Sequence, residues 1–196
     1  MPESHSPHPI VLASGSPYRA ELLARLGRDF EQLSPDIDES PTEGECGEAL
    51  AGRLAGSKAA TVAGYRPGAI VIGSDQVAEC RGRLLGKPGN RDRAIEQLSF
   101  CSGSEIIFHT AVAVRRDHEA FTDSVPTRVA MRSLQRDQIE RYVDADRPFD
   151  CAGAMKSEAL GISLVESINS DDPTALVGLP LTRVVTLLAR LGIDLP

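Results

Sequence analysis

Residues 10–19 read IVLASGSPYR and decide the architecture that the sequence predicts. The first four residues form a short apolar run, which is typical of a buried strand. Ser16 suits a helix N-cap, and Pro17 suits the first helical position, where a missing N–H costs nothing. Apolar residues recur at helical spacing over 18–26, and Gly27 suits the C-terminal cap. The segment therefore predicts a strand, a turn of small residues and a helix.

The predicted turn at residues 14–19 is a candidate phosphate site. A strand that leads small residues into a helix N-terminus presents backbone N–H groups and the positive end of the helix dipole. Arg19, in the first helical turn, suits a forked contact with phosphate oxygens. The glycine and lysine spacings match neither the P-loop nor the dinucleotide fingerprint. An ordinary capped turn with a solvated arginine is the competing interpretation, and the residues alone leave both open.

The rest of the chain alternates helical and extended patterns. Helices are expected over residues 46–63, 90–100, 135–143 and 181–191. Strands are expected over residues 30–33, 69–73, 105–114, 120–131 and 162–168, and a continuation as a strand over 77–80 stays open. The two longest of these strands flank a polar turn and predict a hairpin. The alternation with one long hairpin indicates a mixed α/β architecture.

The composition is that of a globular protein. A chain of 196 residues favours one domain or two tightly joined lobes. Hydrophobic residues make up 41% and charged residues 25%, which leaves enough apolar material for a core. The formal net charge of -7 repels nucleic acid and anionic membranes, so neither is expected as a partner. A phosphorylated substrate would therefore require a local basic pocket.

The N-terminus and the cysteines indicate a cytoplasmic protein. Residues 1–9 are polar and proline-rich, lack the apolar core of a signal peptide and are expected to form a disordered extension. No stretch approaches the roughly 18 consecutive apolar residues that a membrane span requires. The four cysteines are scattered without metal-ligand spacing, which predicts free thiols in a reducing compartment.

Asp75 is the first candidate for chemistry outside the turn. It follows the apolar run 69–73, so we expect it at the carboxyl end of a buried strand, where ligand sites of α/β proteins gather. A carboxylate in that position can hold a divalent cation or take a proton from water. The competing interpretation is an aspartate that caps a turn.

Further candidates are an acidic loop and two lysines. Asp36, Asp38 and Glu39 form a carboxylate cluster that suits Mg²⁺ or Mn²⁺, although an acidic chain also carries solvated acidic loops. Lys58 lies on an otherwise apolar helical stripe, and Lys87 directly precedes a proline. Each lysine alone is equally compatible with an ordinary surface position.

Several segments, taken together, resemble the Maf family over residues 11–191. In chain order they are Leu12-Ala13-Ser14, Ser16-Pro17, Arg19, Leu22-Leu23, Asp38-Glu39, Lys58, Ile72-Gly73-Ser74-Asp75-Gln76, Gly86-Lys87-Pro88, Ser102-Gly103, Ala152-Gly153, Lys156-Ser157-Glu158, Gly161, Asp172-Pro173 and Leu176-Val177-Gly178-Leu179-Pro180. No single segment is decisive, but the order and approximate spacing of the set are highly specific.

The resemblance implies a metal-dependent pyrophosphatase that cleaves a nucleoside triphosphate to the monophosphate and pyrophosphate. It also implies the Maf/ITPase-like fold, an elongated, two-lobed α/β structure around a mixed, twisted sheet with the site in a cleft between the lobes. On this basis, residues 10–196 are expected to form a single domain of two lobes. The family further implies Mg²⁺ or Mn²⁺ as cofactor and a possible homodimer.

The resemblance also assigns roles by position in the pattern. Asp75 is similar to the family's proton acceptor, and Glu39 to a metal-associated carboxylate, so these two are expected to hold one divalent ion. Ser14, Arg19, Lys58 and Lys87 are similar to the triphosphate-binding set. Glu39, Lys58 and Lys87 are expected to complete the catalytic set around Asp75.

Three positions distinguish the family's branches by substrate. Tyr18, Gln76 and Glu158 are similar to the branch that hydrolyses 7-methyl-GTP, whereas the dTTP/UTP branch usually carries Arg, Thr and Gln there. An aromatic face attracts the positively charged methylated guanine, and a carboxylate can accept from its N1–H and N2–H₂ groups. The branch usually has Trp at the position of Tyr18, and the pair Ala154-Met155 is less aromatic than is common.

Two other functions remain open at this stage. One is a dTTP/UTP pyrophosphatase of the same family, and the other is a nucleotide-binding regulator of cell division with little catalysis. All three depend on one spatial expectation, which is that the 14–19 turn, both lysines and both carboxylates converge on one cleft.

Overall fold

The computed structural model describes residues 8–195 of the chain. The first seven residues of the expected N-terminal extension lie outside the described residues. His8 and Pro9 are described; His8 hydrogen-bonds to the segment before β3, and Pro9 to the first residue of β3. The His8 ring lies 3.0 Å from the Gly68 carbonyl oxygen, and Ile70 N donates to the Pro9 carbonyl oxygen at 2.9 Å.

The described residues form one mixed sheet of seven strands, ordered β2-β1-β3-β5-β6-β7, with β4 paired to β3 beside this path. The strand β1 is parallel to β2 and β3, and every other pairing is antiparallel. The strands are β1 (Ile10–Ala13), β2 (Phe30–Leu33), β3 (Ile70–Cys80), β4 (Arg83–Leu85), β5 (Glu105–Arg116), β6 (Glu119–Met131) and β7 (Val165–Ser170). The expected mixed α/β class and the long hairpin β5–β6 are confirmed.

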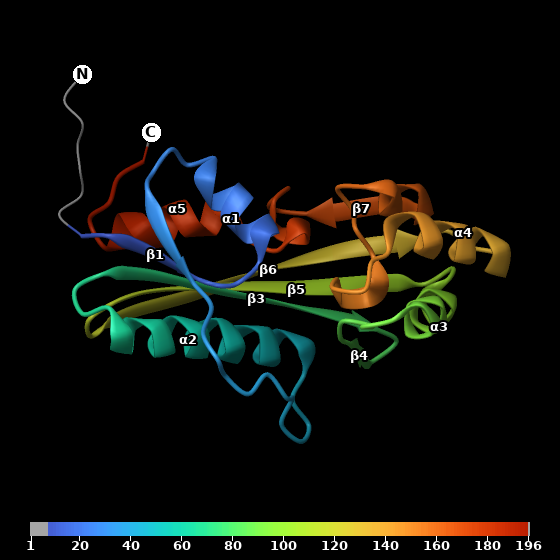
Figure 1. The fold of residues 1–196 in the computed structure, drawn as a ribbon, viewed down its shortest axis with the longest axis horizontal. Helices are drawn as coiled ribbons and strands as arrows, with labels where there is room; N and C mark the ends of the chain where they lie inside the picture. Colours follow the sequence, from blue (N-terminus) through green and yellow to red (C-terminus); the bar gives the residue numbers. More distant parts are fainter. Residues whose placement is uncertain (1–7, 196) are drawn as a thin grey trace.

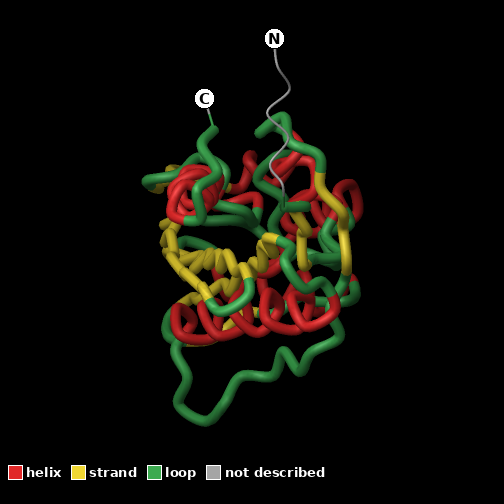
Figure 2. Tube along the Cα trace, turned by 90° about the vertical axis from the view of Figure 1, so that its left-hand side faces the viewer, coloured by secondary structure: helices red, strands yellow, loops and turns green. Residues whose placement is uncertain are grey.

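Helices cover both faces of the sheet. The longest, α2, runs along one face, while α1 and α5 lie on the other (Figure 1). Seen end-on, the sheet lies between these two helical layers (Figure 2). The α-helices are α1 (Pro17–Ala24), α2 (Gly47–Tyr65), α3 (Arg91–Cys101), α4 (Arg136–Asp146) and α5 (Leu181–Arg190), and the 3₁₀ turns are η1 (Ala152–Ala154), η2 (Leu160–Leu164) and η3 (Ala175–Val177).

The alternation of side chains along β3 explains the two layers. Ile70 and Ile72 pack in the hydrophobic cluster with α1 and α5, while Val71 packs in the cluster with α2. A strand that is buried on both faces must be apolar at successive positions, as residues 69–72 are. A third cluster lies at the far end of the sheet, where α3 and α4 pack on β5 and β6. The boundaries expected for a single domain of two lobes stay a prediction.

The helix α2 lies unusually close to β3 at Gly73. A Cβ atom at this position would lie 2.3 Å from the Ala55 carbonyl oxygen and 2.7 Å from the Ala59 nitrogen. Both atoms belong to the backbone of α2 and cannot rotate away. Only glycine therefore lets the helix approach the strand this closely.

Two expected elements differ from the structure. Asp75 was expected where a strand ends, but β3 continues to Cys80 because residues 74–80 pair with β5. The polar residues 74–76 suggested a strand end. The strand can continue through them because each of these side chains has a hydrogen-bond partner inside the fold. The strand expected over 162–168 begins at Val165, since Leu160–Leu164 form the 3₁₀ turn η2.

We expect Gly73→Ala to lower the free energy of unfolding by about 3 kcal/mol, because the added methyl collides with the α2 backbone. Gly56→Ala is the matched control, since a Cβ there meets nothing within 4 Å and should stabilise α2 by about 1 kcal/mol. Urea unfolding followed by far-ultraviolet circular dichroism measures both. Equal effects of the two substitutions would contradict the close approach of helix and strand.

Candidate active site

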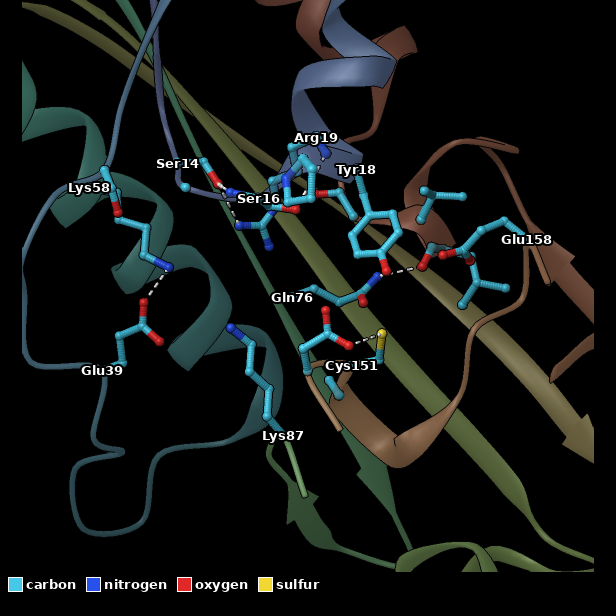
Figure 3. A pocket seen from close by; sticks show the side chains of 18 of the residues that line it. Ser14, Ser16, Tyr18, Arg19, Glu39, Lys58, Gln76, Lys87, Cys151 and Glu158 are labelled. Atoms are coloured by element: carbon cyan, nitrogen blue, oxygen red, sulfur yellow. Dashed lines mark hydrogen bonds and ion pairs between the residues drawn. The ribbon is translucent and has the colours of Figure 1, made fainter. Parts of the chain in front are cut away.

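A cleft of about 420 Å³ opens beside the carboxyl end of β1. Its walls come from the 14–19 turn, α2, β3, the 34–46 loop, Lys87 after β4, and the segments 150–158 and 176–178. Figure 3 shows these segments, distant in the chain, facing one another. The predicted site residues that line it are Ser14, Tyr18, Arg19, Glu39, Lys58, Gln76, Lys87 and Glu158.

Asp75 lies behind this lining, where it is in contact with Lys58. The strand β1 ends at Ala13, which pairs with Gly73, so Asp75 stands just beyond the carboxyl end of β1 in the sheet. Because β1 ends there, no strand of the described residues pairs with residues 74–77 of β3 along this edge, on the side of the cleft. Successive residues of a strand point to opposite faces, so Asp75 faces α2 while Gln76 faces the 175–178 turn.

The 14–19 turn has the expected capping geometry. The Ser16 hydroxyl accepts a hydrogen bond from Arg19 N at 3.4 Å, with Pro17 at the start of α1. Arg19 Nη1 donates to Ser14 Oγ at 3.3 Å, and its Nε donates to the Gly178 carbonyl oxygen at 2.8 Å. Gly178 has φ 123°, a conformation that favours glycine. The guanidinium is therefore fixed in the cleft wall rather than solvated.

The burial of the Arg19 side chain lowers its pKa, and the negative charges of Asp75 and Glu39 oppose that change. The guanidinium stays charged at neutral pH, because an arginine begins so far above it. One cation and two carboxylates therefore influence one another across the cleft.

Lys58 lies between the two predicted carboxylates. Its Nζ atom is 2.6 Å from Glu39 Oε1 and 2.6 Å from Asp75 Oδ1. The side chains of Lys58 and Asp75 are 9% and 10% exposed, so the ammonium and one carboxylate pair in a nearly dry environment. Burial raises the pKa of Glu39, but the hydrogen bond and charge of Lys58, with the charges of Lys87 and Arg19, bring it below its ordinary value. Glu39 is therefore ionised at neutral pH.

The cleft offers two carboxylates as cation ligands. Within residues 8–195, no group of three or more His, Cys, Asp or Glu side chains is arranged to hold a metal ion. Mg²⁺ is commonly held by one or two carboxylates together with substrate phosphates and water. The oxygen donors of Glu39 and Asp75 fit an ion that is shared with a substrate. Asp38, from the same acidic loop, instead accepts a hydrogen bond from Ser40 N at 2.9 Å.

Gln76 is fixed by the backbone of η3. Its Nε2 atom lies 3.0 Å from each of three acceptors, which are Thr110 Oγ1 and the carbonyl oxygens of Ala175 and Leu176. The Thr110 hydroxyl donates to the Ala175 carbonyl oxygen at 2.9 Å, so it can only accept from Gln76. The amide nitrogen must therefore face the turn. The carbonyl oxygen of Gln76 is left as an acceptor in the cleft.

Tyr18 and Glu158 belong to the wall opposite Lys58 and Lys87. Figure 3 shows the Tyr18 ring extending from the 14–19 turn toward the 150–158 segment. Burial raises the pKa of Tyr18, with further increases from the charges of Asp150, Cys151 and Glu158, while Lys156 opposes them. The phenol therefore lies among the polar groups of that segment. Glu158 is exposed at the edge of the cleft.

Sequence reasoning missed the backbone carbonyls of residues 175–178, because a carbonyl group leaves no signal in a side-chain pattern. It also assigned no function to Asp172, which is completely buried. Its Oδ1 accepts from the Thr174 nitrogen and hydroxyl, at 2.7 and 2.6 Å. Its Oδ2 accepts from the Thr182 nitrogen and hydroxyl, at 2.8 and 2.7 Å. Asp172 thereby ties η3 to the start of α5.

The fold and cleft define an α/β protein whose site suits a phosphorylated ligand, with basic groups and a carboxylate pair gathered on one sheet edge. The chain belongs to the Maf family, since the family model described as Maf-like protein matches residues 9–191. The recognised pattern is confirmed at the level of the family.

Curated relatives share about half of the sequence. A 7-methyl-GTP pyrophosphatase from Aromatoleum aromaticum is 52% identical over 189 residues, which cover 95% of this chain and 97% of that protein. One from a Polaromonas species is 51% identical over 189 residues, covering 95% of this chain and 86% of that protein.

A solved structure gives a weaker likeness. The nucleoside-triphosphatase / dITP/XTP pyrophosphatase from Mycobacterium abscessus superposes with a TM-score of 0.41 at 20% identity, over 64% of this chain and 75% of that one. A likeness of this degree carries no functional information. No helix among the described residues is long and apolar enough to cross a membrane.

We expect Asp172→Asn to lower the free energy of unfolding by about 3 kcal/mol, because an amide nitrogen would face donors where a carboxylate oxygen accepts. Burial raises the pKa of Asp172, but its four hydrogen bonds outweigh burial and lower it. The wild type should therefore lose this stability as pH falls below about 4, the value of a free aspartate, and the variant should not.

The control is Asp171→Asn, since Asp171 is exposed beside the same turn. Thermal unfolding at a series of pH values measures all three proteins. Parallel pH profiles for the wild type and Asp172→Asn would contradict the argument.

Proposed function

We propose that this protein hydrolyses nucleoside triphosphates to the monophosphate and pyrophosphate, with 7-methyl-GTP as the preferred substrate. The observation that carries the proposal is that Arg19, Lys58, Lys87 and Glu39 line one cleft of a protein that is negative overall, with Asp75 directly behind Lys58. The curated names of relatives near 50% identity support the same reaction.

The phosphate chain fits the α2 side of the cleft. The N-terminus of α1 supplies backbone N–H groups, and Arg19, Lys58 and Lys87 supply positive charge. Lys58 has three N–H donors, of which Glu39 and Asp75 take two. One donor remains for a phosphate oxygen. These cations stabilise the charge that develops on the leaving pyrophosphate.

Glu39 and Asp75 are the groups that would hold Mg²⁺ or Mn²⁺ together with the triphosphate. Such an ion, when bound, would lower the pKa of a coordinated water and so make it easier to deprotonate. Asp75 is the proposed proton acceptor, because its carboxyl group lies directly behind the cleft lining, in contact with Lys58. Lys58 fixes the orientation of the Asp75 carboxylate through the 2.6 Å contact.

The base fits the side of the cleft that carries Gln76, Tyr18 and Glu158. Gln76 offers only an acceptor, because its amide nitrogen is bound to η3, and the Glu158 carboxylate also only accepts. Guanine presents the donors N1–H and N2–H₂ on one edge, which matches two acceptors. A methylated guanine is a cation, so the aromatic face of Tyr18 and the Glu158 charge both favour it.

Two other functions are less well supported. A dTTP/UTP pyrophosphatase would meet this acceptor-rich wall with a pyrimidine edge that carries two carbonyls. A nucleotide-binding regulator without catalysis would not require a carboxylate pair around Lys58. We also infer a cytoplasmic location, since the free thiols of the four cysteines suit a reducing compartment.

We expect Asp75→Asn to reduce turnover at least about 100-fold, in line with the contribution of a general base. Pyrophosphate release from 7-methyl-GTP, GTP, UTP and dTTP, with Mg²⁺ or Mn²⁺ supplied, measures both activity and preference. Glu79→Gln is the matched control, because Glu79 lies on the same face of β3 but outside the cleft lining. A folded Asp75→Asn protein with near-normal turnover would remove Asp75 from the reaction.

We expect Glu158→Gln to lower kcat/KM for 7-methyl-GTP about tenfold while changing kcat/KM for UTP much less, because the lost charge serves the base and not the phosphates. Glu166→Gln, on the exposed strand β7, is the control. Equal losses for both nucleotides would exclude Glu158 from base recognition.

A further inference from the structure

The segment between β2 and α2 carries Glu39 but has no helix or strand of its own. Residues 34–46 leave the end of β2, hang below α2 and return to its N-terminus (Figure 1). A connection of this length without secondary structure is uncommon unless it serves a function. The position of Glu39 must therefore be set by contacts with the rest of the protein.

Two cations of α2 hold this loop by its polar groups. Lys58 binds Glu39, as described above. Arg53, five positions earlier on α2, binds both oxygens of Glu45, with Nε 2.7 Å from Oε1 and Nη2 2.8 Å from Oε2. Arg53 Nη2 also donates to the Ser40 carbonyl oxygen at 2.9 Å. One guanidinium thus fastens the loop at Ser40, adjacent to Glu39, and at Glu45.

The Glu45 carboxylate is itself held from a second direction. Thr42 N donates to its Oε2 at 2.9 Å. The hydrogen bonds from Arg53 and then from Thr42 lower the pKa of Glu45 to about 2, so it stays ionised wherever the protein is active near neutral pH. The side chain of Glu45 is only 8% exposed although it lies in a loop. Arg53 therefore makes a bidentate, planar contact with the Glu45 carboxylate, which is stronger than an ordinary surface ion pair. We call the contacts of Arg53 with Glu45 and Ser40 the clamp.

The clamp and the Lys58 contact differ in what a substrate does to them. Lys58 shares its ammonium between Glu39 and Asp75 and is also a proposed phosphate ligand, so a bound triphosphate competes for it. Arg53 is outside the cleft lining, so a ligand in the cleft does not compete directly for its contacts. A phosphate that takes the third donor of Lys58 makes Glu39 share the ammonium with one more anion, whereas the clamp still holds the loop at Ser40, beside Glu39.

We propose that Arg53 is a positioning residue, which holds Glu39 in place through the Ser40 carbonyl and Glu45. The effect on kinetics that this inference predicts rests on the proposed function, whereas the ordering of the 34–46 loop by Arg53 does not. Loss of the clamp should weaken the use of the divalent ion and slow turnover, because misplacing a ligand by a small distance is costly. Nucleotide affinity should change less, since Arg19, Lys58 and Lys87 remain.

The test compares Arg53→Gln with Arg66→Gln. Arg66 also lies at α2 and makes a bidentate pair, with Glu31 at 3.0 and 2.7 Å, but this pair joins β2 to the end of α2 rather than holding residues 34–46, and it lies outside the cleft lining. Backbone hydrogen exchange in residues 36–45 should be about tenfold faster in Arg53→Gln and unchanged in Arg66→Gln. Arg53→Gln should lower the thermal midpoint more than Arg66→Gln, because the Glu45 side chain is 8% exposed and that of Glu31 is 47% exposed.

The kinetic arm measures pyrophosphate release from 7-methyl-GTP against Mg²⁺ concentration. Arg53→Gln should raise the half-saturating Mg²⁺ concentration and lower kcat, each about tenfold, with little change in KM for the nucleotide. Glu45→Gln should act in the same direction. Arg53→Lys should recover only part of the loss, because an ammonium cannot bind both oxygens of Glu45 in the same way.

The outcomes separate the two proposals. If the wild type releases no pyrophosphate from any nucleotide, the proposed function fails, while the exchange rates still decide whether Arg53 orders the loop. Unchanged exchange in Arg53→Gln overturns the positioning role. So does faster exchange accompanied by an unchanged Mg²⁺ dependence in an active enzyme. Equal losses of kcat in Arg53→Gln and Arg66→Gln would also overturn the positioning role, because the Arg53 contacts would then contribute only to general stability.

Discussion

The close approach of α2 to β3 at Gly73 is the constraint on which the site depends. Because no Cβ separates the two backbones, Ala55 and Ala59 of the helix lie directly on the strand. Lys58, in the same turn of α2, then reaches Asp75, two residues beyond Gly73. The lysine carries positive charge into a nearly dry environment only because two carboxylates meet it there. A contact between two backbones thus determines the electrostatics of the cleft.

The early end of β1 is equally important, because it lets the neighbouring residues Asp75 and Gln76 contribute to different sides of the cleft. Beyond Ala13 the edge of β3 is open, so Gln76 lines the cleft from one face of the strand, while Asp75 on the other face lies behind the lining in contact with Lys58. Asp75 joins Lys58 and Glu39 on the α2 side, whereas Gln76 joins Tyr18 and Glu158 near η3. Two adjacent residues therefore serve different parts of one ligand, as the two-residue period of a strand requires.

The sequence allowed the elements with strong patterns to be predicted, and the reasons are physical. The run at 69–72 had to be apolar at every position because both faces are buried, and Ser16-Pro17 capped α1 as expected. The strand end at Asp75 was wrong, because partners for polar side chains come from residues distant in the chain. The roles of Arg53 and Asp172 were missed for the same reason. Dimer formation stays a prediction.

The hold of η3 on Gln76 has a consequence for how substrate preference can change over evolution. Three acceptors, Thr110 Oγ1 and two main-chain oxygens, rely on one amide group. A shorter residue at 76 would remove this donor from the Thr110 hydroxyl oxygen and the Leu176 carbonyl oxygen, whereas the Ala175 carbonyl oxygen would keep the Thr110 hydroxyl and Gly178 N. A lineage that changes the residue at position 76 must also change the segment around Ala175, 99 positions away. Substrate selectivity therefore depends on two segments that are distant in the chain and must change together. A single substitution at position 76 is not enough to convert one branch of the family into the other.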